Sequence, residues 1–130
     1  PQVRKGQPAE DILFEMQSRV ILELAQIGPC IIVGRCADAV LRSAGIPAVS
    51  LFICAPFEDR VKRRMEIEGI GQKEAEAAVW KIDKQRKKYY DTYTGQNWGA
   101  PENYDFCINS SVMGIEGTAE QVVAWIRGAW

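Results

Sequence analysis

The chain has 130 residues, of which 47% are hydrophobic, and its formal net charge is −1. This length suits one soluble domain, since domains commonly hold roughly 100–150 residues, and the slightly acidic balance argues against a nucleic-acid-binding protein. The complete absence of histidine excludes Ser-His and Cys-His catalysis within the chain.

Metal and membrane classes are also disfavoured. Four cysteines without C-x-x-C spacing argue against a zinc site. No apolar run approaches the ~20 residues that cross a membrane, and the first residues lack the apolar core of a signal peptide. We therefore expect a cytoplasmic protein without metal ligands, membrane partner or nucleic-acid partner. The sequence leaves open whether it forms a homo-oligomer.

The first part of the chain predicts a helix followed by a strand. Residues 9–27 repeat apolar side chains at steps of three and four, at Leu13, Met16, Val20, Leu24 and Ile27. Gly28-Pro29 ends this helix. Residues 30–33, CIIV, are apolar without alternation, which predicts a short strand buried on both faces.

The remaining elements alternate in the same way. We expect helices over 37–44, 57–69, 72–93 and 118–128, strands over 48–55 and 104–109, and a turn-rich loop over 94–103. Buried strands separated by helices indicate an α/β fold with a parallel sheet. We expect one domain over 1–130. Its architecture should have three layers, with helices on both faces of the sheet. The sheet itself should be incomplete in this chain, because three strands are few for this class.

Positive charge is concentrated in the middle of the chain. Ten of the sixteen Lys and Arg residues fall between Arg60 and Lys88, which favours a small anionic ligand over a long polyanion. Arg60, Arg63 and Arg64 are spaced i, i+3 and i+4, so they share one helix face. That face either meets an anion or is simply solvated.

The long helix carries an arginine within its apolar stripe. Arg86 stands where the pattern calls for an apolar residue, one turn after Asp83 and beside Lys87. Arg86 either extends its charged end to solvent past its own aliphatic stem or meets an anion in a cleft. The Asp83 spacing also fits an ordinary helix ion pair, so both interpretations stay open.

A second candidate site follows the first expected strand. Arg35 and Asp38 come after Gly34, at the carboxyl end of a strand, where open α/β sheets collect ligands. An exposed arginine and a helix-starting aspartate are the plain alternative. VGRCAD has a single glycine, and the sequence contains neither G-x-x-x-x-G-K-[ST] nor G-x-G-x-x-G, so this is not a phosphate-binding loop.

Four segments together resemble the cytidylate kinase-like family, a branch of the P-loop nucleoside monophosphate kinases. They are IIVGRCADAVL, VSLFICAPFEDRVKRRME, KIDKQRKKYYDTYTGQNWG and PENYDFCINSS. The resemblance extends from about Pro8 to Ile126 and is most specific from Lys81 to Trp98. It implies a phosphotransferase that moves a phosphoryl group from ATP, with Mg²⁺, to a nucleoside monophosphate. CMP and dCMP are the acceptors that the resemblance favours.

The resemblance also implies roles for the basic residues. Arg35 would contact the acceptor nucleotide with Asp38 nearby, and Arg63 would contact ATP. A lid-like region would cover about 57–103. The residues around the transferred phosphoryl group would be Arg60, Arg64, Asp83, Arg86 and Lys87.

The family's glycine-rich loop lies before the helix that opens this chain. We therefore expect the chain to be the C-terminal part of a longer kinase, inactive alone and without tightly bound ATP or Mg²⁺. Two alternatives remain: a kinase of another small phosphorylated or hydroxyl acceptor, and a non-enzymatic, degenerate kinase module that senses a nucleotide or binds a partner.

Overall fold

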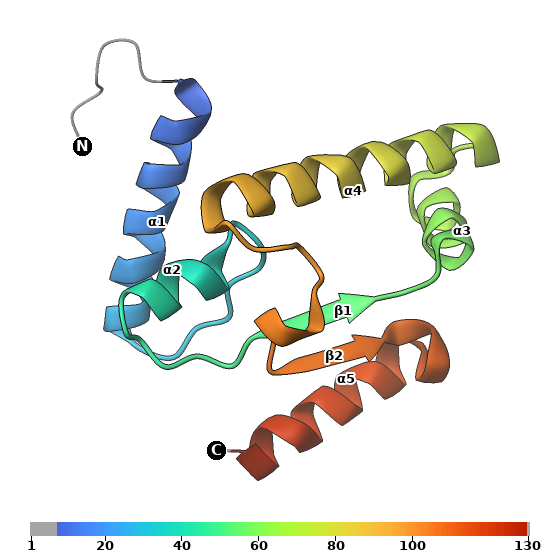
Figure 1. Ribbon diagram of the computed structural model, residues 1–130. Helices are drawn as coiled ribbons and strands as arrows, with labels where there is room; N and C mark the ends of the chain where they lie inside the picture. The colour runs from blue at the N-terminus through green and yellow to red at the C-terminus, as the bar shows by residue number, and fades with distance from the viewer. Residues whose placement is uncertain (1–7, 130) are drawn as a thin grey trace. The chain divides into compact units, whose positions relative to one another are not determined.

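The computed structural model describes residues 8–129, which are mostly helical with a small parallel sheet (Figure 1). In chain order the elements are α1 (Ala9–Ile27), α2 (Ala37–Ser43), β1 (Leu51–Cys54), α3 (Phe57–Glu68), α4 (Gln72–Thr94), the 3₁₀ turn η1 (Pro101–Asn103), β2 (Phe106–Asn109) and α5 (Ser110–Ala129). Within these residues no helix is both long enough and apolar enough to cross a membrane.

The chain divides into two compact units. Unit 1 comprises the residues up to Ala48 together with Tyr90–Gln96, and unit 2 comprises Val49–Tyr89 together with the residues from Asn97 onward. Helix α4 runs through the boundary, so its last turn belongs to unit 1. Both helices and strands are present, so the chain is an α/β protein made of these two units.

Unit 1 is built around the contact between α1 and α2. Ile21 of α1 is buried with Ala37 and Leu41 of α2, and partly buried apolar residues pack around them. The last turn of α4 adds an aromatic contact, because the ring of Tyr93 stacks on that of Phe14 with centroids 4.3 Å apart. The predicted helices at 9–27 and 37–44 are confirmed.

Unit 2 contains the sheet. Strands β1 and β2 pair in parallel, with Leu51 opposite Phe106 and Cys54 opposite Asn109. Helix α5 lies along β2 (Figure 1), where the rings of Trp125 and Phe106 are 5.1 Å apart. Helices α3 and α4 share a second core of Val61, Ala75 and Val79.

The predicted strand at 30–33 is wrong for the described structure. Residues 29–33 form neither helix nor strand, and Ile31 and Val33 are 95% and 88% exposed. A strand needs a neighbour to take its backbone hydrogen bonds, and within residues 8–129 only β1 and β2 pair. The sheet therefore has two described strands instead of the three predicted.

The predicted boundaries differ most for the last helix. It starts at Ser110, directly after β2, and contains a non-helical residue at Gly114, with φ 74° and ψ 178°. Only glycine adopts that combination readily, so Gly114 lets a short first turn join the helix predicted from 118 onward.

Candidate functional site

Arg60 is held by three hydrogen bonds in unit 2. Its Nε donates to the carbonyl oxygen of Ala55, 2.9 Å away, just after the carboxyl end of β1. Its Nη1 lies 2.8 and 2.7 Å from the two carboxylate oxygens of Asp83 on α4. The first turn of α3 is thereby tied both to the end of the sheet and to the middle of α4.

This arrangement neutralises Arg60. The Arg60 and Asp83 side chains are 36% and 30% exposed, and a charge-assisted pair is shorter and stronger than a neutral hydrogen bond. The guanidinium also lies 5.8 Å from the centroid of the Phe57 ring. Arg60 and Asp83 thus lie together in the structure, where they bind each other.

The other two arginines of α3 differ from Arg60. Arg64 donates from Nε to Glu68 at 2.9 Å, an i, i+4 pair on the helix surface. Arg63 is exposed, and within residues 8–129 no hydrogen bond or ion pair engages it. The three arginines of the predicted positive face thus differ. Arg60 is bound to α4, Arg64 is bound within its own helix, and Arg63 is available to a ligand.

Arg86 and Lys87 lie one turn beyond Asp83 on α4. Both side chains are exposed, while Ala75 and Val79 of the same helix are buried. In the described part of the chain, Arg86 makes no hydrogen bond and no ion pair. The guanidinium of Arg86 thus reaches solvent, where it is open to an anion.

The turn between α1 and α2 has an unusual backbone. Gly34, Arg35 and Cys36 have successive positive φ angles of 73°, 58° and 56°. Two of these residues are not glycine, and a non-glycine residue in the left-handed region costs roughly 1–2 kcal/mol. Arg35 is exposed, and no residue of the described chain hydrogen-bonds or ion-pairs with it. Such strain is often found at functional positions.

Asp38 is placed differently from Arg35. Its side chain is only 13% exposed and lies 3.8 Å from Nη2 of Arg42. The hydroxyl of Tyr90, at the end of α4, donates to Asp38 over 2.7 Å. Asp38 therefore joins α2 to the last turn of α4, whereas its sequence neighbour Arg35 points its charge to solvent.

Sequence reasoning missed the tyrosines as partners of the acids. Tyr90 is 5% exposed and bonds to Asp38, and the hydroxyl of Tyr93 donates to Asp11 of α1 at 2.5 Å. The available signal was the placement of two tyrosines three residues apart near a helix end, where one turn brings both to the same side.

Cys36, the last residue of this turn, has a thiol whose pKa is strongly shifted. Burial, and to a smaller extent the negative charge of Asp38, together raise the pKa of its thiol from 9.0 to about 11. The thiolate is the reactive form of cysteine, so Cys36 is an inert core residue near neutral pH.

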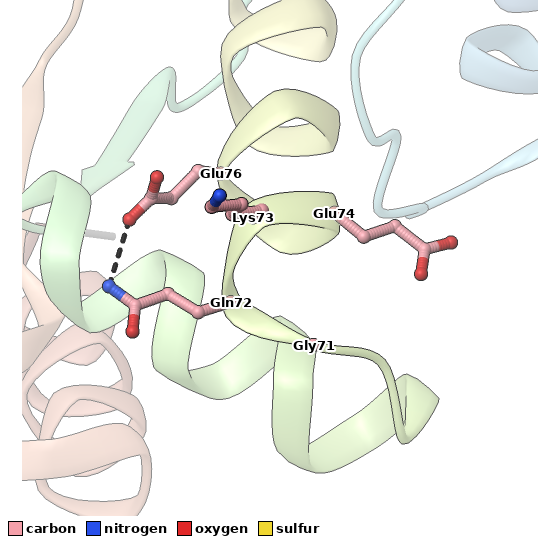
Figure 2. A pocket seen from close by; sticks show the side chains of 5 residues that line it. All are labelled: Gly71, Gln72, Lys73, Glu74 and Glu76. Carbon is pink, nitrogen blue, oxygen red and sulfur yellow. Dashed lines mark hydrogen bonds between the residues drawn. The ribbon is translucent and has the colours of Figure 1, made fainter.

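A surface depression lies at the start of α4, and none of the predicted site residues lines it. Figure 2 shows its lining: Gly71, Gln72, Lys73, Glu74 and Glu76. The amide of Gln72 donates to Glu76 at 2.9 Å. With two carboxylates and one ammonium group, this surface is poorly suited to a phosphate.

The chain matches known proteins in two comparisons. Residues 2–112 match the model of the cytidylate kinase-like family. The chain is also similar to the crystal structure of an uncharacterized protein from Eubacterium ventriosum, with 31% identity and a TM-score of 0.83 over 95% of this chain and 69% of that one. None of the curated proteins matches.

The fold is thus that of a mostly helical α/β protein with a small parallel sheet. The chain belongs to the cytidylate kinase-like family, because the family match covers most of its length and the structural relative agrees over nearly all of it. All eight residues predicted at the site lie inside the matched range. Six of them are in unit 2, and Arg35 and Asp38 are in unit 1.

Proposed function

We propose that this protein is a phosphotransferase that moves a phosphoryl group from ATP to a nucleoside monophosphate, with CMP or dCMP as the first acceptors to test. The observation that carries the proposal is the family match over residues 2–112. In this proposal the two described strands belong to a three-layer, P-loop-type sheet, and the region 57–103 acts as the lid.

The chemistry of this reaction suits the residues present. Phosphoryl transfer depends on positioning and on stabilising charge more than on covalent catalysis. The planar guanidinium fork of arginine pairs with two phosphate oxygens at once. Arg86 and Arg63 are exposed and uncommitted, so we assign Arg86 to the transferred phosphoryl group and Arg63 to the donor.

The remaining residues of unit 2 have supporting roles in this proposal. Asp83 fixes the guanidinium of Arg60 at the carboxyl end of β1, so Arg60 positions the first turn of α3. Because α3 and α4 are joined by that pair, Arg63 and Arg86 are carried on a rigid support. Arg64 and Lys87 add positive charge around the phosphates.

We assign the acceptor side to Arg35. Its guanidinium would bind the phosphate of the nucleoside monophosphate, and the strained turn would hold it in place. Asp38, which accepts from Tyr90, would maintain this turn by fixing the start of α2. The resemblance implies that Asp38 lies near the acceptor, and in this proposal Asp38 acts there by holding the turn that carries Arg35.

ATP with Mg²⁺ is the expected donor. The exposed arginines fit phosphate oxygens, and bound Mg²⁺ takes most of its ligands from phosphates and water, with one or two carboxylates. Among residues 8–129 no group of three His, Cys, Asp or Glu is arranged for a metal ion. The exposed arginines thus fit the phosphates of ATP. When bound, ATP would supply the phosphoryl group that is transferred.

A coupled ADP-release assay on the protein from the full reading frame tests the proposal. The acceptors are CMP, dCMP, UMP and AMP, with a panel of phosphorylated and hydroxyl metabolites for the alternative that the acceptor is not a nucleotide. Arg86→Ala should lower kcat on the order of 100-fold or more. Lys88→Ala, an exposed cation two residues away on another side of α4, should leave kcat unchanged. Absence of turnover with every acceptor would refute the enzyme assignment.

A second candidate is a degenerate kinase module that binds a nucleotide without turnover. The exposed guanidinium groups of Arg35, Arg63 and Arg86 favour nucleotide binding in this candidate as well, because they suit phosphate oxygens whether or not a phosphoryl group is transferred. The two candidates separate in one pair of measurements. CMP binding by calorimetry without ADP release supports the module, and CMP binding with ADP release supports the kinase.

A further inference from the structure

Four polar side chains of unit 1 form a closed ring of contacts. The hydroxyl of Tyr90 lies 2.7 Å from Oδ2 of Asp38 and 3.4 Å from Oε1 of Gln96. Nη1 of Arg42 lies 3.4 Å from the same oxygen of Gln96, and its Nη2 lies 3.8 Å from Oδ2 of Asp38. We call this set the polar ring; its members are Asp38, Arg42, Tyr90 and Gln96. It links α2, the last part of α4 and the turn that follows α4.

The polar ring depends on the amide oxygen of Gln96. Arg42 has only donors, so Gln96 must turn its oxygen toward it and not its NH₂ group. The same oxygen is the second acceptor for the hydroxyl of Tyr90. Tyr90 and the side chain of Asp38 are only 5% and 13% exposed, and hydrogen bonds shielded from water are stronger than exposed ones. Replacing Gln96 by a residue without this oxygen therefore opens the ring on two sides.

The turn after α4 fixes where Gln96 lies. Oγ1 of Thr94 accepts from the backbone N–H of Gln96 over 3.0 Å and donates to the carbonyl oxygen of Tyr90 over 2.7 Å. Between them Gly95 has a φ of 69° and donates from its N–H to the carbonyl oxygen of Asp91. A glycine in this left-handed conformation is a common way to end a helix. The backbone of the turn thus places Gln96 beside the hydroxyl of Tyr90.

On its other side the polar ring adjoins the strained turn that carries Arg35. The N–H of Ala37 donates to the carbonyl oxygen of Gly34 over 3.2 Å, and the N–H of Val40 donates to that of Cys36 over 3.0 Å. The carbonyl groups on either side of Arg35 are therefore bonded to the first residues of α2, where the aspartate of the ring also lies. A displacement of this end of α2 must move the backbone that carries the guanidinium.

We propose that Gln96 is a positioning residue for the acceptor phosphate, and that the turn over 94–96 regulates acceptor binding by closing the polar ring. This role rests on the proposed function, in which Arg35 binds the phosphate of the nucleoside monophosphate. A cation whose backbone is already ordered loses less conformational freedom when it binds, so the acceptor should bind more tightly when the ring is closed. The cation assigned to the donor, Arg63, belongs to unit 2, and donor binding should not depend on the ring.

Steady-state kinetics of the protein from the full reading frame test this role, with CMP and ATP varied in turn. Gln96→Ala should raise the KM for CMP about fivefold, since two contacts of the ring are lost, and should leave kcat and the KM for ATP unchanged. A substitution that only reduces the folded fraction lowers the apparent kcat and leaves both KM values as they are. The control Gln26→Ala changes an exposed glutamine of α1 in the same unit and should leave all three constants unchanged.

Cys36 supplies a second measurement that needs no nucleotide. Its side chain is buried, whereas the other three cysteines are exposed, so alkylation of Cys36 by iodoacetamide follows the opening of the turn. Trypsin cleaves after Arg35 and Arg42, so Cys36 is recovered alone in the peptide 36–42. Gln96→Ala should speed the alkylation of Cys36 about fivefold, and Gln26→Ala should leave the rate unchanged.

Failure of this role and failure of the proposed function give different results. A protein that neither binds nor phosphorylates CMP refutes both. If Arg35→Gln weakens CMP binding and Gln96→Ala does not, the acceptor assignment stands and the positioning role is refuted. The role is also refuted if Gln96→Ala raises the KM values for CMP and ATP equally, or if its Cys36 is alkylated at the rate of the unchanged chain.

Discussion

The two units fix their helices with different chemistry. In unit 1 the acids Asp11 and Asp38 accept from neutral tyrosine hydroxyls at the end of α4. In unit 2 the acid Asp83 is paired with the charged guanidinium of Arg60. In both units a carboxylate is occupied in holding helices, while an arginine, Arg35 or Arg86, remains exposed. The comparison separates residues that position the fold from cations that are available to a ligand.

The largest expected effect concerns the buried thiol of unit 1. The pKa of Cys36 is about 11 in the folded chain against an ordinary value of 9.0, so folding favours the protonated form. This stabilisation is complete below pH 9 and is lost as the pH rises from 9 to 11. The loss should reach about 2–3 kcal/mol. Urea unfolding followed by circular dichroism should show it in the unchanged chain but not in Cys36→Ala; parallel pH curves would contradict it.

The next effect concerns the ion pair of unit 2. Asp83→Asn removes the negative charge that faces Arg60 and should destabilise unit 2 by about 2 kcal/mol, because a part-buried guanidinium loses its partner. Tryptophan fluorescence during urea unfolding reports this unit, since Trp80, Trp98 and Trp125 all belong to it. The control Glu68→Gln, at the surface pair with Arg64, should cost about 0.5 kcal/mol or less. Equal losses in the two variants would show that the Arg60 pair is an ordinary surface contact.

A smaller effect is expected in the tyrosine contacts of unit 1. Tyr90→Phe deletes one hydroxyl that donates to a mostly buried carboxylate, which should cost about 1.5 kcal/mol. Tryptophan fluorescence should register little of this loss, because no described residue of unit 1 is a tryptophan. Circular dichroism should register it. A change seen equally by both probes would mean that the two units unfold together.

The smallest effect has the opposite sign. Arg35→Gly relieves a positive φ of 58° and should stabilise the chain by about 0.5–1 kcal/mol. The same substitution removes the cation assigned to the acceptor phosphate, so CMP binding should weaken. Denaturation and calorimetry on one preparation check both parts. A variant that loses stability would show that the guanidinium supports the turn instead of straining it.

The sequence predicted most elements for reasons that are local. Helices α1, α3 and α4 were placed within one residue at either end, because apolar spacing, good helix formers and terminal glycines all act within a few residues. The strand at 30–33 was wrong because strand formation depends on a neighbour that local pattern does not reveal. Local pattern also does not reveal which face of a helix is covered. The apolar residues whose spacing predicts α1 are exposed, whereas Ile21 forms the contact with α2.

The candidate site was predictable in its residue types but not in its pairings. Spacing along one helix allowed an ordinary ion pair of Asp83 with Arg86 or Lys87 and decided nothing about a more distant partner. In the structure Asp83 binds Arg60 of α3, twenty-three residues earlier. Contacts between elements depend on packing that a single sequence does not display. The same limit hid Tyr90 as the partner of Asp38, since these two residues are fifty-two positions apart.

The account rests on the distinction between arginines that hold the fold and arginines that are available to a phosphate. Calorimetric titration of CMP into the chain and into its Arg35→Gln variant tests this most directly, because the substitution removes the cation assigned to the acceptor phosphate without touching the Arg60–Asp83 pair. We expect the CMP affinity to fall at least tenfold while the urea midpoint is unchanged. An unchanged CMP affinity in a folded Arg35→Gln protein would contradict the account.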